Sequence, residues 1–190
     1  MSGATPRPLR ADAARNRARL LDVATEVFTT RGVTVPTEEI ARAAGVGVGT
    51  LFRHFPTKEA LLEAVVVRRL ETLTADTARL AAGHPPAEAF RACFRLVVER
   101  SAGKQEFTRA LADAGVDVHA SLRESSDLMR ARLAGLLAAA QRAGAVRPDL
   151  GLPELVALLV GVGTAVEHLA DDPAARERIF EVVFAGLRPR

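Results

Sequence analysis

Residues 37–58 constrain the fold of this chain more than any other segment. They contain two short stretches with helical spacing of apolar residues, separated by Gly45, and a third helical pattern begins directly after Pro56. A glycine can adopt the left-handed conformation that a tight turn between two helices requires. This succession predicts a helix-turn-helix followed by a supporting helix, an arrangement that places one short helix in the major groove of DNA.

The segment that precedes this motif predicts one long helix over residues 11–31. Its apolar residues recur at helical spacing and should form one buried stripe: Leu20, Ala24, Val27 and Phe28. Gly32 follows the last helical residue, as is common at helix C-termini.

Within the motif, short helices are predicted over residues 37–44 and 48–55. Thr37 begins the first, and the two glutamates after it suit the positive end of the helix dipole. In the second helix Leu51 and Phe55 stand one turn apart, so we expect them to be buried. The opposite face of that helix should then be exposed.

After Pro56 the helical pattern continues to the C-terminus without strand alternation or repeats. Trp and Tyr are absent from the chain, and Ala, Leu, Val and Arg dominate, a composition that favours helices. Further helices are predicted over about 58–80, 86–101, 104–114, 118–143, 153–170 and 173–187. The expected fold is all-α, with an N-terminal three-helix helix-turn-helix DNA-binding domain and a C-terminal helical bundle. The predicted parts are a flexible basic arm (1–10), the helix-turn-helix domain (11–57) and a larger helical domain (58–190), for which the family resemblance given below implies regulation by ligand binding and dimerisation.

The positive charge of the chain is concentrated at its N-terminal end. Residues 1–60 hold 9 Lys+Arg and 6 Asp+Glu, whereas residues 61–190 hold 17 of each, so the net charge of +3 belongs to the first segment. Five arginines precede residue 20: Arg7, Arg10, Arg15, Arg17 and Arg19. Such a segment suits contact with phosphates, and a solvated tail is the alternative interpretation.

Several other classes of protein find little support in the sequence. The single cysteine, Cys93, cannot form an internal disulfide, which suits a reducing compartment. The longest apolar run, residues 155–166, is shorter than the roughly 20 residues that span a bilayer. The four histidines lack metal-ligand spacing, and no nucleotide-binding or hydrolase motif is present, so we expect no cofactor, no metal and no membrane association in a cytoplasmic protein. The alternatives to DNA binding are a helical enzyme and a protein-interaction scaffold that uses residues 118–143.

Residues 15–64 resemble the TetR family of bacterial transcriptional regulators. The motifs that carry the resemblance are Phe28…Arg31-Gly32, Thr37…Ile40-Ala41…Ala44-Gly45-Val46, Gly49-Thr50-Leu51-Phe52-Arg53-His54-Phe55-Pro56 and Lys58-Glu59-Ala60-Leu61. The resemblance implies a homodimer that binds a palindromic operator in double-stranded DNA, most often as a repressor. It also implies a small molecule that binds the C-terminal domain and releases the DNA.

The resemblance and the exposed face of the second short helix together select the DNA-contacting residues. Phosphate contacts are implied at Thr37, His54 and Lys58, and for Thr37 a plain N-cap role is the alternative. The residues expected to face the bases are Val48, Gly49, Thr50 and Arg53. Arg53 is the strongest candidate for a charged contact, either with guanine or with a phosphate.

Two positions depart from the family pattern. Phe52 stands where tyrosine is commoner and offers only an apolar contact, and Gly47 replaces the usual Ser or Thr cap. Our hypothesis is that specificity depends on Arg53, Thr50, close approach at Gly49 and insertion of the arginines of residues 7–19 into a minor groove.

The C-terminal half carries two further predictions. The resemblance implies a cavity for an unidentified small apolar ligand, and the residues on the helices that surround it in the family are Phe90, Cys93, Phe94, Phe107, His119, Leu122 and Met129. Residues expected in the dimer interface are Leu155, Leu158, Leu159, Val162, Val166, Ile179, Val183 and Phe184. The alternative for both sets is an ordinary intramolecular core.

Overall fold

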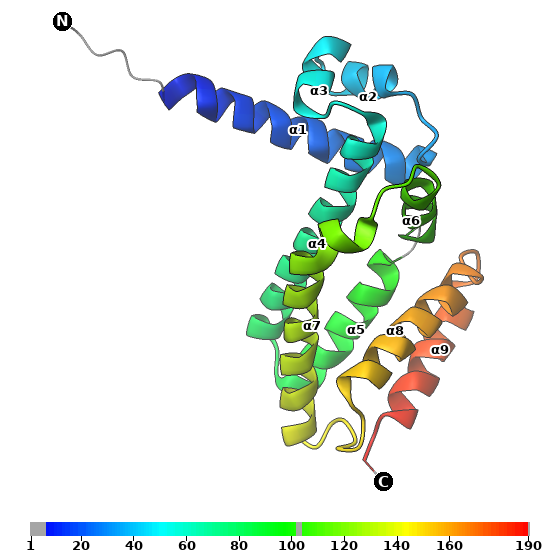
Figure 1. Cartoon of the computed structure of the whole chain (residues 1–190). Coiled ribbons are helices and arrows are strands. Elements are labelled where there is room, and N and C mark those ends of the chain that lie inside the picture. Colours follow the sequence, from blue (N-terminus) through cyan, green and yellow to red (C-terminus); the bar gives the residue numbers. More distant parts are fainter. Residues whose placement is uncertain (1–6, 102–103, 190) are drawn as a thin grey trace, which may run out of the picture. The chain divides into compact units, whose positions relative to one another are not determined.

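The chain folds into α-helices throughout the part that the structure describes (Figure 1). This computed structural model describes residues 7–101 and 104–189, without the side chains of residues 7–12, 104–106, 108, 118, 119 and 121. The helices are α1 (Arg7–Arg31), α2 (Thr37–Ala43), α3 (Val48–His54), α4 (Lys58–Gly83), α5 (Pro86–Arg100), α6 (Lys104–Asp113), α7 (Val118–Arg142), α8 (Leu152–Glu167) and α9 (Pro173–Gly186). The predicted all-α class is confirmed.

The largest difference from the predicted boundaries lies at the start of α1. The helix begins at Arg7, four residues before the predicted start, so residues 7–10 of the predicted flexible arm are helical. Pro8 is the second residue of α1, where a missing backbone N–H costs nothing because the first N–H groups of a helix have no partner within it. Residues 1–6 of the predicted arm lie outside the described residues.

The first of two compact units contains α1–α3, the first part of α4 up to Arg69, and residues 105–122. Its apolar core joins Phe28 of α1, Ile40 of α2 and Leu51 of α3 to residues of α4 and α6. The rings of Phe28 and Phe107 meet edge to face, with centroids 6.2 Å apart. The unit therefore extends beyond the predicted boundary at residue 57, because α6 buries its apolar face in the same core.

The second compact unit contains residues 70–104 and 123–190. Helices α5 and α8 pack against each other and α8 packs against α9. Phe94 of α5 contacts Phe180 and Phe184 of α9, with ring centroids 6.5 and 5.5 Å apart. Arg95 reinforces this contact: its guanidinium donates two hydrogen bonds to Glu177 and lies 4.3 Å from the centroid of the Phe180 ring.

Two kinds of feature are absent from residues 7–101 and 104–189. None of the helices there has the length and apolar character needed to cross a membrane. Within the same ranges, no three His, Cys, Asp or Glu side chains lie close enough together to hold a metal ion.

Candidate nucleic-acid interface

The turn between α2 and α3 depends on one glycine. Gly45 has a φ of +68°, in the left-handed region that favours glycine, as predicted. The N–H groups of Gly45 and Val46 donate to the carbonyls of Arg42 and Ala41 at 3.0 Å, which closes the end of α2. Gly47 then provides an extended N-cap for α3, and its carbonyl accepts from the N–H of Thr50 at 2.9 Å.

Helix α3 has one face in the core and one face in solvent. Leu51 is completely buried and Phe55, at its C-terminal end, is 2% exposed, which confirms the prediction for both. Val48 and Phe52 are about 40% exposed, unusually high for large apolar side chains. Among the other predicted contacts on α3, Gly49 and Arg53 are exposed, and Thr50 and His54 are half-buried. The predicted base-facing residues are therefore all at least partly accessible.

Two cations of this surface, Arg53 and Lys58, form no ion pair among the described residues. Neither a salt bridge nor a side-chain hydrogen bond involves Arg53 or Lys58 within the described ranges. Arg31, at the end of α1, is by contrast paired with Glu39 of α2. Because a phosphate would not have to displace a carboxylate from Arg53 or Lys58, both are available for DNA.

Lys58 lies at the capped start of α4. The hydroxyl oxygen of Thr57 accepts from the N–H of Ala60 at 3.1 Å and so caps the helix. A backbone hydrogen bond, then a hydrogen bond with Thr57, lower the pKa of Glu59 below its usual value. Glu59 is therefore ionised at neutral pH, and Lys58 stands at the first position of α4 beside the short helix α3.

Thr37 is less accessible than the other predicted phosphate contacts. It is the first residue of α2, but it is only 7% exposed, and its hydroxyl lies 3.4 Å from a carboxylate oxygen of Glu38. The alternative N-cap role belongs instead to Pro36, whose carbonyl accepts from Glu39 and Ile40. A phosphate contact at Thr37 stays a prediction and would involve a small exposed area.

Two arginines of α1 lie against the helix-turn-helix, a feature that the sequence analysis missed. The guanidinium carbon of Arg17 is 4.9 Å from the centroid of the Phe55 ring, within cation–π range. A guanidinium nitrogen of Arg19 lies so close to Gly45 that an added Cβ would be 3.1 Å from it. These contacts place exposed positive charge beside α3, and no sequence signal links residues so far apart in the chain.

The predicted ligand residues do not gather around one cavity. Phe90, Phe94 and Met129 are packed in the main core of the second unit, and Cys93 belongs to a smaller buried cluster there. Phe107 and Leu122 belong to the core of the first unit, and the side chain of His119 lies outside the described residues. Their role in ligand binding stays a prediction.

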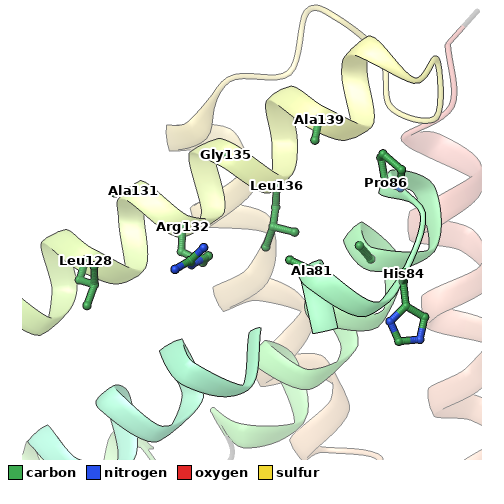
Figure 2. Close-up of a pocket in the computed structure, with 10 residues that line it drawn as sticks. Ala81, His84, Pro86, Leu128, Ala131, Arg132, Gly135, Leu136 and Ala139 are labelled. Carbon is green, nitrogen blue, oxygen red and sulfur yellow. The ribbon is translucent and has the colours of Figure 1, made fainter. Parts of the chain in front are cut away.

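An open groove of about 370 Å³ lies in the second unit, among other residues (Figure 2). It is formed by the end of α4, the start of α5 and the middle of α7. Its lining residues are Ala81, His84, Pro86, Ala89, Leu128, Ala131, Arg132, Gly135, Leu136 and Ala139. Burial raises the pKa of the Cys93 thiol, and the charge of Arg132 partly opposes this shift, so Arg132 lies near this buried cluster.

The predicted dimer residues divide into two groups. Leu155, Leu159, Val162 and Val166 are at most 6% exposed within a single chain, so they belong to the core of the second unit. The other four, Leu158, Ile179, Val183 and Phe184, are half-buried. The large apolar side chains that remain exposed on α8 and α9 are Val160 at 62% and Val182 at 72%.

The arrangement defines a class of protein: a helix-turn-helix DNA-binding unit followed by a helical bundle. Two family descriptions match the sequence, "Bacterial regulatory proteins, tetR family" over residues 20–65 and "Transcriptional regulator SbtR-like, C-terminal domain" over residues 85–189. The chain belongs to the TetR family of bacterial transcriptional regulators, and its helix-turn-helix binds DNA.

Solved structures and curated relatives agree with this assignment. The TetR transcription regulatory protein from Mycobacterium vanbaalenii is 42% identical, with a TM-score of 0.78 over 95% of this chain and 99% of that one. A TetR transcriptional regulator from Streptomyces coelicolor is 36% identical, with a TM-score of 0.75 over 91% and 98%. An HTH-type transcriptional regulator of Staphylococcus aureus is 40% identical over 65 residues, 34% of this chain. The chain spans about a third (35%) of the length of that curated relative. These relatives are regulators rather than enzymes.

Proposed function

We propose that the protein is a ligand-responsive repressor that binds a palindromic operator as a homodimer. The observation that carries this proposal is the exposed face of α3, where Arg53 lacks an acidic partner within the described ranges while Leu51 fixes the opposite face in the core. A helix held this rigidly from one side presents its other side to a DNA groove at little conformational cost.

The contacts divide by chemistry. Lys58 and His54 would hold phosphates, and Arg17, fixed on the Phe55 ring, would add a further cation beside them. Arg53 would read guanine and Thr50 would bond a base edge or a phosphate. Val48 and Phe52 offer apolar area that suits thymine methyl groups.

Dimerisation supplies the second recognition helix that a palindrome requires. Val160 and Val182 are the exposed apolar residues that support an interface on α8 and α9. Small residues on the same two helices, such as Gly161 of α8 and Ala185 of α9, are also exposed and would permit close approach of a second copy.

Release by a ligand requires that the ligand bind better to a form of the protein that does not bind DNA. The groove on the second unit supports a ligand-binding role, since its volume lies within the usual range for small-molecule sites. A regulator of this kind acts where the chromosome is, in the cytoplasm.

The test is a mobility-shift titration of a duplex that the wild-type protein selects from a random library. The variant Arg53→Gln/Lys58→Gln should lose about a hundredfold or more in affinity. Each subunit loses the contact of Arg53 with guanine or a phosphate, and the contact of Lys58 with a phosphate. Arg130→Gln, which removes an exposed arginine of α7, is the matched control and should bind as the wild type does. Circular dichroism should show the same helicity for all three proteins.

Full affinity in the double variant would contradict binding through α3. Selection of duplexes without two-fold symmetry would contradict the homodimer on a palindrome, even if α3 still proved essential.

A further inference from the structure

Arg132 projects from α7 into the open groove of the second unit. Figure 2 shows its side chain between Leu128 and Leu136, on the side of α7 that faces α4 and α5. Most of the groove lining is apolar, with several alanines and the two leucines, and Leu128 is 56% exposed. A ligand that covers such an exposed apolar side chain removes apolar surface from water, which favours binding.

The guanidinium of Arg132 takes part in no hydrogen bond or salt bridge within the described ranges. Other arginines of the same unit are differently placed: Arg79 lies against Asp76, Arg95 against Glu177, and Arg147 against Asp149. The guanidinium of Arg132 is planar and has five N–H donors, a geometry that matches a carboxylate. No carboxylate of the described residues is paired with it.

The only other titratable group in the lining is His84. Its Nδ1 lies 3.0 Å from the carbonyl oxygen of Leu80, and since a carbonyl only accepts, Nδ1 is the donor and carries the proton. The permanent positive charge among the lining residues is the guanidinium of Arg132.

We propose that this groove binds a small amphipathic monocarboxylate. The carboxylate would pair with Arg132, and its aliphatic or aromatic body would cover Leu128, Leu136 and the alanines of the lining. A volume of about 370 Å³ suits a body of modest size. That this ligand is the effector rests on the proposed function; that it binds here does not.

The experiment measures binding to the full-length protein without DNA, by thermal shift and isothermal titration. The probes are sodium octanoate and 1-octanol, which share an alkyl chain and differ in the charged head. Octanoate should raise the melting temperature in a concentration-dependent way at millimolar concentration, and octanol should do so far less. The variant Arg132→Gln should weaken octanoate binding by about tenfold to a hundredfold, the usual contribution of a hydrogen bond to a charged group. Arg130→Gln should leave it unchanged.

A second variant tests the groove without touching the arginine. Gly135 lines the groove, and a Cβ added there would meet no atom within 4 Å, so Gly135→Leu should fold while its side chain occupies the site. It should abolish octanoate binding.

Three results would overturn the proposal. Octanoate could bind Arg132→Gln as tightly as the wild type, octanol could bind the wild type as tightly as octanoate does, or octanoate could leave the melting temperature of the wild type unchanged. If octanoate binds as expected and the selected duplex is not released, the groove assignment stands and release by this ligand fails. If no duplex is bound at all, the proposed function fails while the groove assignment is still decided by the thermal shifts.

Discussion

The DNA-binding face and the ligand groove are assembled in opposite ways. The face on α3 comes from one short segment, in which Leu51 points to the core and Arg53 points away from it. The groove combines Ala81 and Pro86, on either side of the junction between α4 and α5, with Arg132 of α7, which is distant in the sequence. Local spacing alone determines which residues of a short helix share a face, whereas a groove between helices depends on how those helices pack.

The two regions also use charge differently. On the DNA-binding side Arg53 and Lys58 are without acidic partners among the described residues, while in the second unit Arg95 is held by Glu177 and stacks on Phe180. A paired arginine stabilises its own fold, and an unpaired one is available to a partner. Arg132 also takes part in no ion pair among the described residues, and it differs from other such arginines of the second unit in that it lines the groove.

The largest effect that we expect from one substitution concerns Val160 and the oligomeric state. Val160→Asp should weaken dimerisation by about a hundredfold or more, because a carboxylate would be buried without a partner in an apolar interface. Sedimentation or light scattering at micromolar concentration should then show a monomer with unchanged helicity.

Leu128→Asp is the matched control for this substitution. Leu128 is almost as exposed as Val160, at 56% against 62%, but it lies on α7 rather than on α8. This variant should remain dimeric. The proposal that α8 lies in a dimer interface would be wrong if the wild-type protein were monomeric. It would also be wrong if the Val160→Asp variant remained dimeric.

Helix α8 also shows where sequence reasoning stops. The residues 155, 159, 162 and 166 follow one another at helical spacing and form the stripe that faces α5 and the core. Because α8 is apolar nearly all round, its sequence offers a second stripe that includes Val160, and apolar spacing cannot decide which stripe meets the chain's own core. The predicted interface included the inward stripe for this reason.

The helix-turn-helix could be predicted in much greater detail. The left-handed turn at Gly45 follows from the residue type, and the burial of Leu51 and Phe55 follows from their spacing of one helical turn. The contact of Arg17 with Phe55 and the groove around Arg132 could not be predicted, since each joins residues that only the packed structure brings together.

Two glycines of the DNA-binding region should respond to alanine with opposite signs. Gly45→Ala should destabilise the first unit by about 1–2 kcal/mol, the usual cost of a left-handed conformation for a residue with a Cβ. Gly49→Ala should stabilise it by about 0.5–1 kcal/mol, because Gly49 is helical and an added Cβ meets nothing within 4 Å. Urea unfolding of the two variants beside the wild type measures both effects. A Gly45→Ala variant as stable as the wild type, or more stable, would show that the turn does not require the left-handed conformation.

The smallest effect concerns the link between α5 and α9. The hydrogen bond from Arg95 holds the pKa of Glu177 below its usual value of 4.5. A carboxylate with a lowered pKa in the folded state stabilises that state above its unfolded pKa and loses this contribution as the pH falls through the folded pKa. The wild type should therefore lose stability more steeply below about pH 4.5 than Glu177→Gln does.

The control is Glu88→Gln, which removes an exposed carboxylate of α5 that has no salt bridge in the described part of the chain. Its unfolding should follow the wild-type pH dependence. The difference at Glu177 should be small, because both partners are partly exposed and water screens their attraction. If Glu177→Gln and the wild type change in parallel as the pH falls, the α5–α9 contact is stabilised by the packing of Phe94, Phe180 and Phe184 alone. The pairing of Arg95 with Glu177 would then not stabilise the second unit, and this energetic difference from the unpaired Arg53 of the DNA-binding face would disappear.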